Sequence, residues 1–222
     1  DAAGVQSIVA AKAGCCGAVK FHLNDQSGGL AQMRANIDAW WPYVERGEVE
    51  AIVMNASGCG VTVKEYAHHL QHDAAYAERA QRISALTQDL SELLPGLVSA
   101  LQPRVNAKEA AAHGVLAYHP PCTLQHGQQL KGGVEQPLRA LGFDVRVATN
   151  EAHLCCGSAG TYNIEQPELA RQLGERKTRN ILKTDAQAIV MGNIGCMVQI
   201  ENMLAAVGKP LPVLHTMEVL AR

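Results

Sequence analysis

Several hallmarks of common protein classes are missing from this sequence of 222 residues. No apolar run approaches the roughly 18–20 residues that a helix needs to cross a bilayer. The formal net charge of −2 provides no overall positive field for nucleic acid. No G-x-G-x-x-G or P-loop motif follows a strand-like run, and no Ser/His/Asp arrangement stands out. We therefore expect no membrane span, no nucleic-acid partner and no nucleotide site of these types.

Cysteine is the informative residue. The count is odd, four of the cysteines form two adjacent pairs, and neighbouring cysteines cannot bridge each other without strain. A disulfide scaffold would be shorter and evenly paired, so we predict free thiols in a reducing, cytoplasmic setting. The seven cysteines are Cys15, Cys16, Cys59, Cys122, Cys155, Cys156 and Cys196.

The chain contains an internal repeat. Residues 13–18 (AGCCGA) resemble residues 153–158 (HLCCGS), and residues 51–59 (AIVMNASGC) resemble residues 188–196 (AIVMGNIGC). The two matches occur in the same order and at nearly the same offset. Such agreement is hard to obtain by chance, and it indicates two copies of one cysteine-rich unit.

The repeat predicts three parts of the chain. They are a first repeat over residues 1–72, a helical connector and linker over residues 73–113, and a second repeat over residues 114–222. Cys122 precedes Cys155 in the second repeat, whereas the corresponding position of the first repeat falls before the first residue. We therefore expect the chain to begin inside its first repeat, as a fragment of a longer protein.

Strand-like runs alternate with helical patterns in both copies, which is typical of an α/β fold with parallel βαβ units. We expect two repeated Rossmann-like, cysteine-rich halves related by a pseudo-two-fold axis. The predicted strands cover residues 5–9, 49–54, 115–118, 143–147, 188–191 and 212–214. The predicted helices cover residues 28–45, 74–94, 125–141 and 167–183, with two more after Gly60 and from about Cys196.

Each cysteine follows the carboxyl end of a predicted strand. Loops at these ends meet at one edge of a parallel sheet, so distant thiols should converge there. Cys59 and Cys196 also lie near predicted helix starts, where backbone N–H groups favour thiolate. The second repeat supplies four thiols and the first supplies three. All seven cysteines are therefore candidate metal and cofactor ligands.

Four thiolates suit either tetrahedral zinc or an iron–sulfur cluster. Neither repeat has the paired C-x2-C knuckles that are typical of structural zinc. Adjacent cysteines can bind different iron atoms of one cluster, which a single zinc ion cannot exploit. The pattern favours iron–sulfur, with zinc as the alternative in at least one site.

Histidines lie close to these cysteines and elsewhere. His119, His126 and His153 could be ligands or hydrogen-bond donors to cluster sulfur, but we favour a donor or packing role over ligation. A second group lies on a probable helix, where an i and i+4 pair could bind metal but a solvated face is the better interpretation. That group is His68, His69 and His72.

At these motifs the chain resembles a known family. The strings at residues 13–18, 56–60, 121–126 (PCTLQH) and 153–162 (HLCCGSAGTY) are similar to the tandem cysteine-rich (CCG) domains of glycolate oxidase iron–sulfur subunits. The wider family includes heterodisulfide reductase, anaerobic glycerol-3-phosphate dehydrogenase and lactate-utilisation subunits. The resemblance covers nearly the whole chain.

The resemblance implies an iron–sulfur subunit, with [4Fe–4S] favoured, that is cytoplasmic or peripheral on the inner face of the cytoplasmic membrane. Such subunits pass electrons from flavoprotein subunits, which oxidise the 2-hydroxy acid, toward the quinone pool. This chain alone is not expected to oxidise glycolate.

Two features depart from the family pattern. The fullest motif ends in C-x-x-C, and both copies here lack its last cysteine, with Thr62 and Gln199 in its place. We therefore expect four-cysteine rather than five-cysteine sites. The family's upstream ferredoxin-like motifs are also absent from this sequence. Two other functions stay open: a zinc-stapled domain that docks the catalytic subunit, and a heterodisulfide reductase-like redox subunit.

Overall fold

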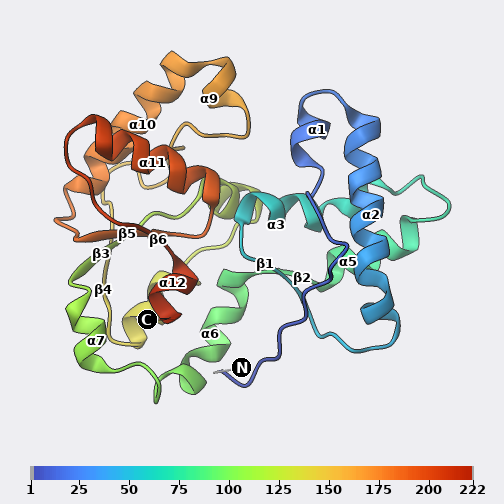
Figure 1. Ribbon diagram of the computed structural model, residues 1–222, viewed down its shortest axis with the longest axis horizontal. Coiled ribbons are helices and arrows are strands. Elements are labelled where there is room, and N and C mark those ends of the chain that lie inside the picture. The colour runs from blue at the N-terminus through green and yellow to red at the C-terminus, as the bar shows by residue number, and fades with distance from the viewer. Residues whose placement is uncertain (1–2, 222) are drawn as a thin grey trace. The chain divides into compact units, whose positions relative to one another are not determined.

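The computed structural model describes residues 3–221, which form two compact units. The N-terminal unit comprises Gln6–Leu90, and the C-terminal unit comprises residues 91–221 with residues 3–5. Both contain parallel strands joined by helices (Figure 1), which confirms the predicted α/β class and the two cysteine-rich regions.

The C-terminal unit is built on a four-stranded parallel sheet. The strand order is β4-β3-β5-β6. Tyr118 at the end of β3 pairs with Val147 of β4 and Val190 of β5, so these carboxyl ends lie at one edge. The four strands are β3 (Val115–Tyr118), β4 (Asp144–Val147), β5 (Ala188–Met191) and β6 (Val213–His215).

Two helical layers cover this sheet (Figure 1). Ile189 of β5 packs with Ile200 on the side of α10 and α11, whereas its neighbour Val190 packs with Leu138 in the opposite core. This alternation follows from the two-residue period of a strand. The helices of the unit are α6 (Leu90–Leu101), α7 (Ala107–Ala112), the π-helix Thr123–Gly127, α8 (Glu135–Ala140), α9 (Tyr162–Glu165), α10 (Pro167–Leu182), α11 (Ile194–Ala206) and α12 (Thr216–Ala221).

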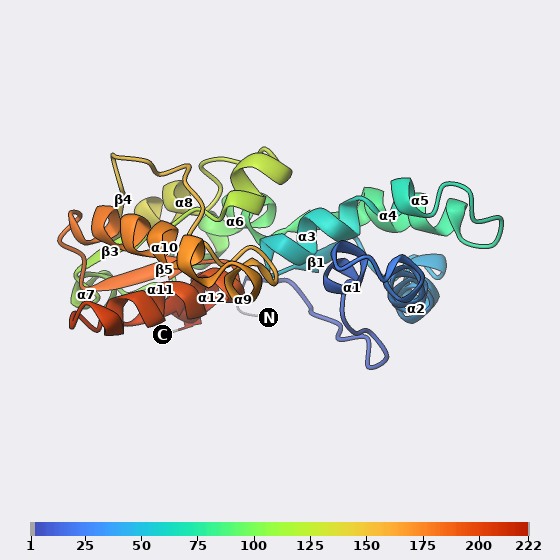
Figure 2. The ribbon, with the colours of Figure 1, turned by 90° about the horizontal axis from the view of Figure 1, so that it is seen from above.

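The N-terminal unit has a pair of parallel strands and five helices among its described residues. Ile52 of β1 pairs with Thr87 of β2, and Met33, Ile37 and Val63 are fully buried in the core. The elements are α1 (Ala18–His22), α2 (Gln26–Glu45), β1 (Ile52–Met54), α3 (Ser57–Lys64), α4 (Tyr66–His69), α5 (Ala77–Leu86) and β2 (Thr87–Asp89). Figure 2 shows α1 lying beside α2.

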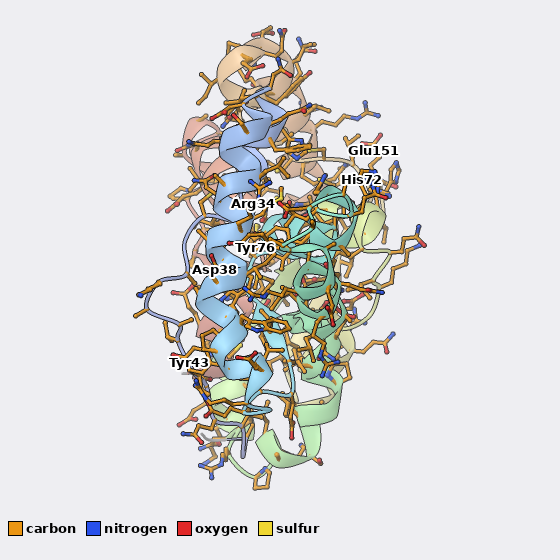
Figure 3. The ribbon with its side chains drawn as sticks, turned by 90° about the vertical axis from the view of Figure 1, so that its right-hand side faces the viewer. Arg34, Asp38, Tyr43, His72, Tyr76 and Glu151 are labelled. Atoms are coloured by element: carbon orange, nitrogen blue, oxygen red, sulfur yellow. The ribbon has the colours of Figure 1, made fainter. Side chains whose placement is uncertain are left out.

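Polar contacts tie α2 to the segment before α5. Arg34 Nε lies 2.7 Å from Asp73 Oδ2, and the Tyr76 hydroxyl donates to Asp38 Oδ2 at 2.8 Å. Figure 3 shows Arg34 and Asp38 on α2 with Tyr76 beside them. Although α2 is 20 residues long, no helix within residues 3–221 has both the length and the apolar character to cross a bilayer.

The predicted helix over residues 125–141 was wrong as a continuous element. The chain forms a short π-helix, then a loop, and only then α8. Gly133 in this loop lies against the Ser91 carbonyl, so closely that a Cβ there would meet the oxygen at 2.2 Å. Tertiary packing against that backbone therefore overrides the helical pattern.

Two further predictions, one in the connector and one in the first repeat, were wrong. The helix predicted over residues 74–94 is interrupted by β2, because Thr87–Asp89 pairs with β1. Residues 5–9 form no strand, and Val9 is 87% exposed. In the second repeat, the equivalent of residues 5–9 is β4, an edge strand whose hydrogen-bonded neighbour is β3. The N-terminal unit has no counterpart of β3 among its described residues, so residues 5–9 lack the strand with which they would pair.

Candidate metal centre

The structure brings the four cysteines of the C-terminal unit together. Cys122 follows β3, the Cys155–Cys156 pair follows β4, and Cys196 lies in the first turn of α11 after β5. Cys122 Sγ lies 3.9 Å from Cys155 Sγ, and the sulfurs of Cys156 and Cys196 lie within 4.8 Å of each other. Sheet topology explains this convergence, because the three preceding strands end at one edge. We call these residues the C-terminal cysteine cluster.

The spacing of one pair suits a shared metal atom. Two thiolates on one tetrahedral ion, each with a metal–sulfur bond of about 2.3 Å, lie about 3.8 Å apart. The Cys122–Cys155 separation of 3.9 Å is close to this value. The donor set therefore fits a thiolate-bound metal or cluster without rearrangement of this pair.

Hydrogen bonds divide the four thiols into two donors and two acceptors. Bonds from Cys122 and Cys156 lower the pKa of Cys155, and a bond from Cys156 lowers the pKa of Cys196. The same bonds raise the pKa of Cys122 and of Cys156, since each holds its proton for a neighbour. A bound cation would release the remaining thiol protons.

Neutral donors also point at the sulfurs. Gly157 N donates to Cys155 Sγ at 3.3 Å, and Asn193 Nδ2 donates to Cys196 Sγ at 3.3 Å. Both contacts favour thiolate over thiol. In iron–sulfur proteins, hydrogen bonds of this type also set the reduction potential.

A cation lies close to the same thiols. Lys177 on α10 is 1% exposed, and its Nζ donates to the carbonyls of Glu151 and Ala152 at 2.8 and 3.0 Å. Burial lowers the pKa of Lys177, and negative charge on the neighbouring cysteines opposes that shift. The lysine therefore holds the cysteine loop from a buried position.

The three cysteines of the N-terminal unit also lie together. Cys59 and Cys15 both affect the pKa of the Cys16 thiol, although the three sulfurs form no group of closely spaced ligand atoms within residues 3–221. The bond from Cys59 lowers the pKa of Cys16, and the same bond raises the pKa of Cys59. Cys15 is exposed and Cys16 is buried. We call Cys15, Cys16 and Cys59 the N-terminal cysteine cluster.

Two buried polar side chains clamp this cysteine pair. Asn36 accepts from Gly14 N at 2.7 Å and donates to the Cys15 carbonyl at 2.9 Å. The Tyr66 hydroxyl donates to the Cys16 carbonyl at 2.7 Å and accepts from Asn36. Both side chains are at most 1% exposed. Sequence reasoning missed them because they lie more than 20 residues from the cysteines they hold.

The glycine after each cysteine pair has a backbone conformation that favours glycine. Gly17 and Gly157 both have φ of +93°, a left-handed conformation that L side chains rarely adopt. A Cβ on Gly17 would meet the Gly29 carbonyl oxygen at 2.7 Å, and one on Gly157 would meet the Ala170 oxygen at 2.4 Å. The third position of the Cys-Cys-Gly motif therefore lets the loop turn directly against the following long helix.

The histidines differ in burial and in their distance from the cysteine sulfurs. His119 is buried, and its ligand nitrogen lies within 4.8 Å of the Cys156 and Cys196 sulfurs. His126 and His153 are exposed, and His126 Nε2 contacts the His153 carbonyl at 3.1 Å. His68 and His72 are exposed and His69 packs on Phe21, and none belongs to a potential metal-ligating group among residues 3–221.

The positions without the final cysteine of C-x-x-C are used otherwise. Thr62 Oγ1 donates to the Gly58 carbonyl at 3.2 Å within α3. Gln199 is 6% exposed, and its Nε2 donates to the Ala170 carbonyl at 3.3 Å. Gln199 therefore holds the helix backbone against which Gly157 packs.

Comparison with known proteins agrees with this architecture. A family model described as the cysteine-rich CCG domain matches residues 1–64 and 116–201. The glycolate oxidase iron-sulfur subunit of Escherichia coli (strain K12) is 46% identical over 220 residues, which cover 99% of this chain and 51% of that protein. Lactate utilization protein A of Geobacillus thermodenitrificans is 30% identical over 214 residues, 93% of this chain and 82% of that protein.

A further relative is more distant. The probable glycolate oxidase iron-sulfur subunit of Bacillus subtilis (strain 168) is 29% identical over 199 residues, 90% of this chain and 43% of that protein. The chain thus spans about half of the length of the two glycolate oxidase subunits that it matches.

Proposed function

The chain belongs to the cysteine-rich (CCG) domain family, and from this premise we propose that it is the iron–sulfur electron-transfer part of a glycolate (2-hydroxy acid) oxidase complex. Electrons would arrive from a flavoprotein subunit and leave toward the quinone pool. The chain itself would carry electrons and leave hydroxy-acid oxidation to its partner. The two relatives named as glycolate oxidase iron-sulfur subunits support this choice of complex.

The convergence of Cys122, Cys155, Cys156 and Cys196 carries the proposal. Four thiols from three separate loops are a costly arrangement for packing alone, because thiolates that share a buried site repel one another. A bound cationic metal core removes this repulsion and keeps the sulfurs together. We propose that these four, together with the N-terminal cysteine cluster, hold iron–sulfur clusters, with [4Fe–4S] favoured.

When bound, such a cluster supplies one-electron oxidation and reduction. The protein supplies the surroundings. Gly157 N and Asn193 Nδ2 donate to the sulfurs, and buried Lys177 adds positive charge. All three favour the more negative, reduced state, because each interacts more strongly as negative charge grows. The C-terminal cluster is therefore built to accept electrons readily.

One observation favours a second function. The Cys122–Cys155 separation of 3.9 Å equals that of two thiolates on one zinc ion within about 0.2 Å. A zinc-stapled C-terminal unit would dock the catalytic subunit and carry no electrons. Zinc would give the unit stability without any redox role.

Elemental analysis separates the two functions. The protein, purified without oxygen, should contain about four irons and four acid-labile sulfides for each occupied cluster of this chain. It should also transfer electrons when it is combined with its flavoprotein subunit. Zinc without sulfide at these cysteines would overturn the electron-carrier proposal and leave the docking function.

A further inference from the structure

His119 occupies a fixed place at the end of β3. Its backbone N–H donates to the Val190 carbonyl of β5 at 2.9 Å, which extends the sheet pairing by one residue. Leu116 and Tyr118 pack into the core on the α8 side, and Ala117 packs into the core on the α10 and α11 side. Because side chains alternate along a strand, His119 follows Ala117 to the α10 and α11 side.

That side is where the C-terminal cysteine cluster lies. Cys156 and Cys196 belong to the same core as Ala117. The ligand atoms of His119, Cys156 and Cys196 all lie within 4.8 Å of one another, and all three residues are buried. The imidazole is 2% exposed, and its Nε2 has no hydrogen-bond partner among the described residues. A buried imidazole nitrogen without a partner is unfavourable unless a ligand takes it.

The neighbouring thiols indicate what that ligand would be. The ligand atoms of His119, Cys156 and Cys196 have the spacing of donors to one metal atom, since two thiolates on one ion lie about 3.8 Å apart. The position that would supply another cysteine holds Gln199, whose amide donates to the Ala170 carbonyl instead. His119 is therefore the buried imidazole beside the thiols of Cys156 and Cys196, and its Nε2 makes no hydrogen bond within residues 3–221.

We propose that His119 is a metal ligand, so that the C-terminal unit binds its cluster through four thiolates and one imidazole nitrogen. This proposal rests on the proposed function for the identity of the metal. The N-terminal cysteine cluster has no equivalent histidine among the described residues. The two clusters would therefore differ in ligand type and in potential, since imidazole in place of thiolate raises the potential of an iron–sulfur centre.

Pulsed EPR on the reduced, full-length subunit tests this assignment. Protein labelled with ¹⁵N-histidine should show the strong hyperfine coupling of a metal-bonded nitrogen, several-fold larger than that of a hydrogen-bonded one. The coupling should vanish in His119→Cys and persist in His126→Gln and His153→Gln, the exposed histidines of the same loops. His119→Cys should keep its iron, because thiolate replaces imidazole, and should show a lower potential for this cluster.

The outcomes separate this proposal from the proposed function. Iron and sulfide present, with only weak histidine coupling, would overturn the ligand role and leave the electron carrier intact. If the unit contains zinc instead, X-ray absorption at the zinc edge decides: one nitrogen that is lost in His119→Cys supports ligation although the electron carrier fails, and sulfur alone overturns both. Protein without metal at this unit also overturns both.

Discussion

Asn36 of α2 and Lys177 of α10 occupy equivalent positions in the two repeats. Each lies seven residues after the helix residue that the motif glycine touches, Gly29 in one unit and Ala170 in the other. Each side chain donates to backbone carbonyls of its own cysteine loop. The repeats thus share one way of holding the loop, but only the C-terminal unit does so with a charged side chain.

Replacing this buried cation should change both stability and potential. Lys177→Gln leaves the carbonyls of Glu151 and Ala152 without their common donor, so we expect a loss of about 1–3 kcal/mol in unfolding free energy. Loss of positive charge beside the cluster should also make its potential more negative. Denaturation and an EPR-monitored redox titration measure the two effects. Lys209→Gln, at an exposed lysine, serves as control. An unchanged potential in a folded Lys177→Gln protein would contradict the electrostatic role.

The motif glycines should not tolerate a side chain. Gly17→Ala and Gly157→Ala force a Cβ into a left-handed backbone and onto the carbonyls of Gly29 and Ala170. We expect each to cost about 1–3 kcal/mol and to lower the metal content of its own unit. Gly14→Ala is the matched control, because it lies beside Cys15 with open space around its Cβ position. Metal analysis and thermal unfolding compare the three; equal behaviour would show that the turn can shift.

The pattern of apolar residues predicted those strands whose side chains are fully buried. β5 is buried at every residue and was found from its apolar run, whereas β2 reads Thr-Gln-Asp and carries no such signal. Convergence of the thiols followed from sheet topology, which is a general rule. The clamps formed by Asn36 and Tyr66 could not be found, since they depend on packing between distant segments. His119 did carry a signal, because strand alternation places it on the side of Ala117.

Removing one hydroxyl should loosen the N-terminal cysteine pair. Tyr66→Phe keeps the buried ring but takes away the donor to the Cys16 carbonyl and the acceptor for Asn36. We expect a loss of about 1–3 kcal/mol and faster loss of metal from this unit under chelator. Tyr43→Phe, which keeps its ring contact with Arg46, is the control. Chelator kinetics equal to wild type would show that the clamp does not hold the pair.

The ion pair between Arg34 and Asp73 should make the stability of the N-terminal unit depend on pH. The hydrogen bond from Arg34 holds the pKa of Asp73 below its usual value of 3.8. Its stabilisation is therefore present above about pH 4 and is lost as pH falls through the lowered value. Asp73→Asn should be less stable than wild type at pH 7, and the two should converge in acid. Urea unfolding at several pH values checks this, and a constant gap would point to lost backbone contacts instead.

Single cysteine substitutions should show what each unit binds. Cys196→Ser removes a donor of the C-terminal cluster and Cys59→Ser removes one of the N-terminal cluster. If each unit holds its own four-iron cluster, each variant should lose about four irons, and the double variant should lose about eight. Val198→Ala, an exposed site on the same helix as Cys196, should lose none. Loss of zinc rather than iron in Cys59→Ser would assign zinc to the N-terminal unit. Unequal losses of iron would show that the two units do not hold the same cluster.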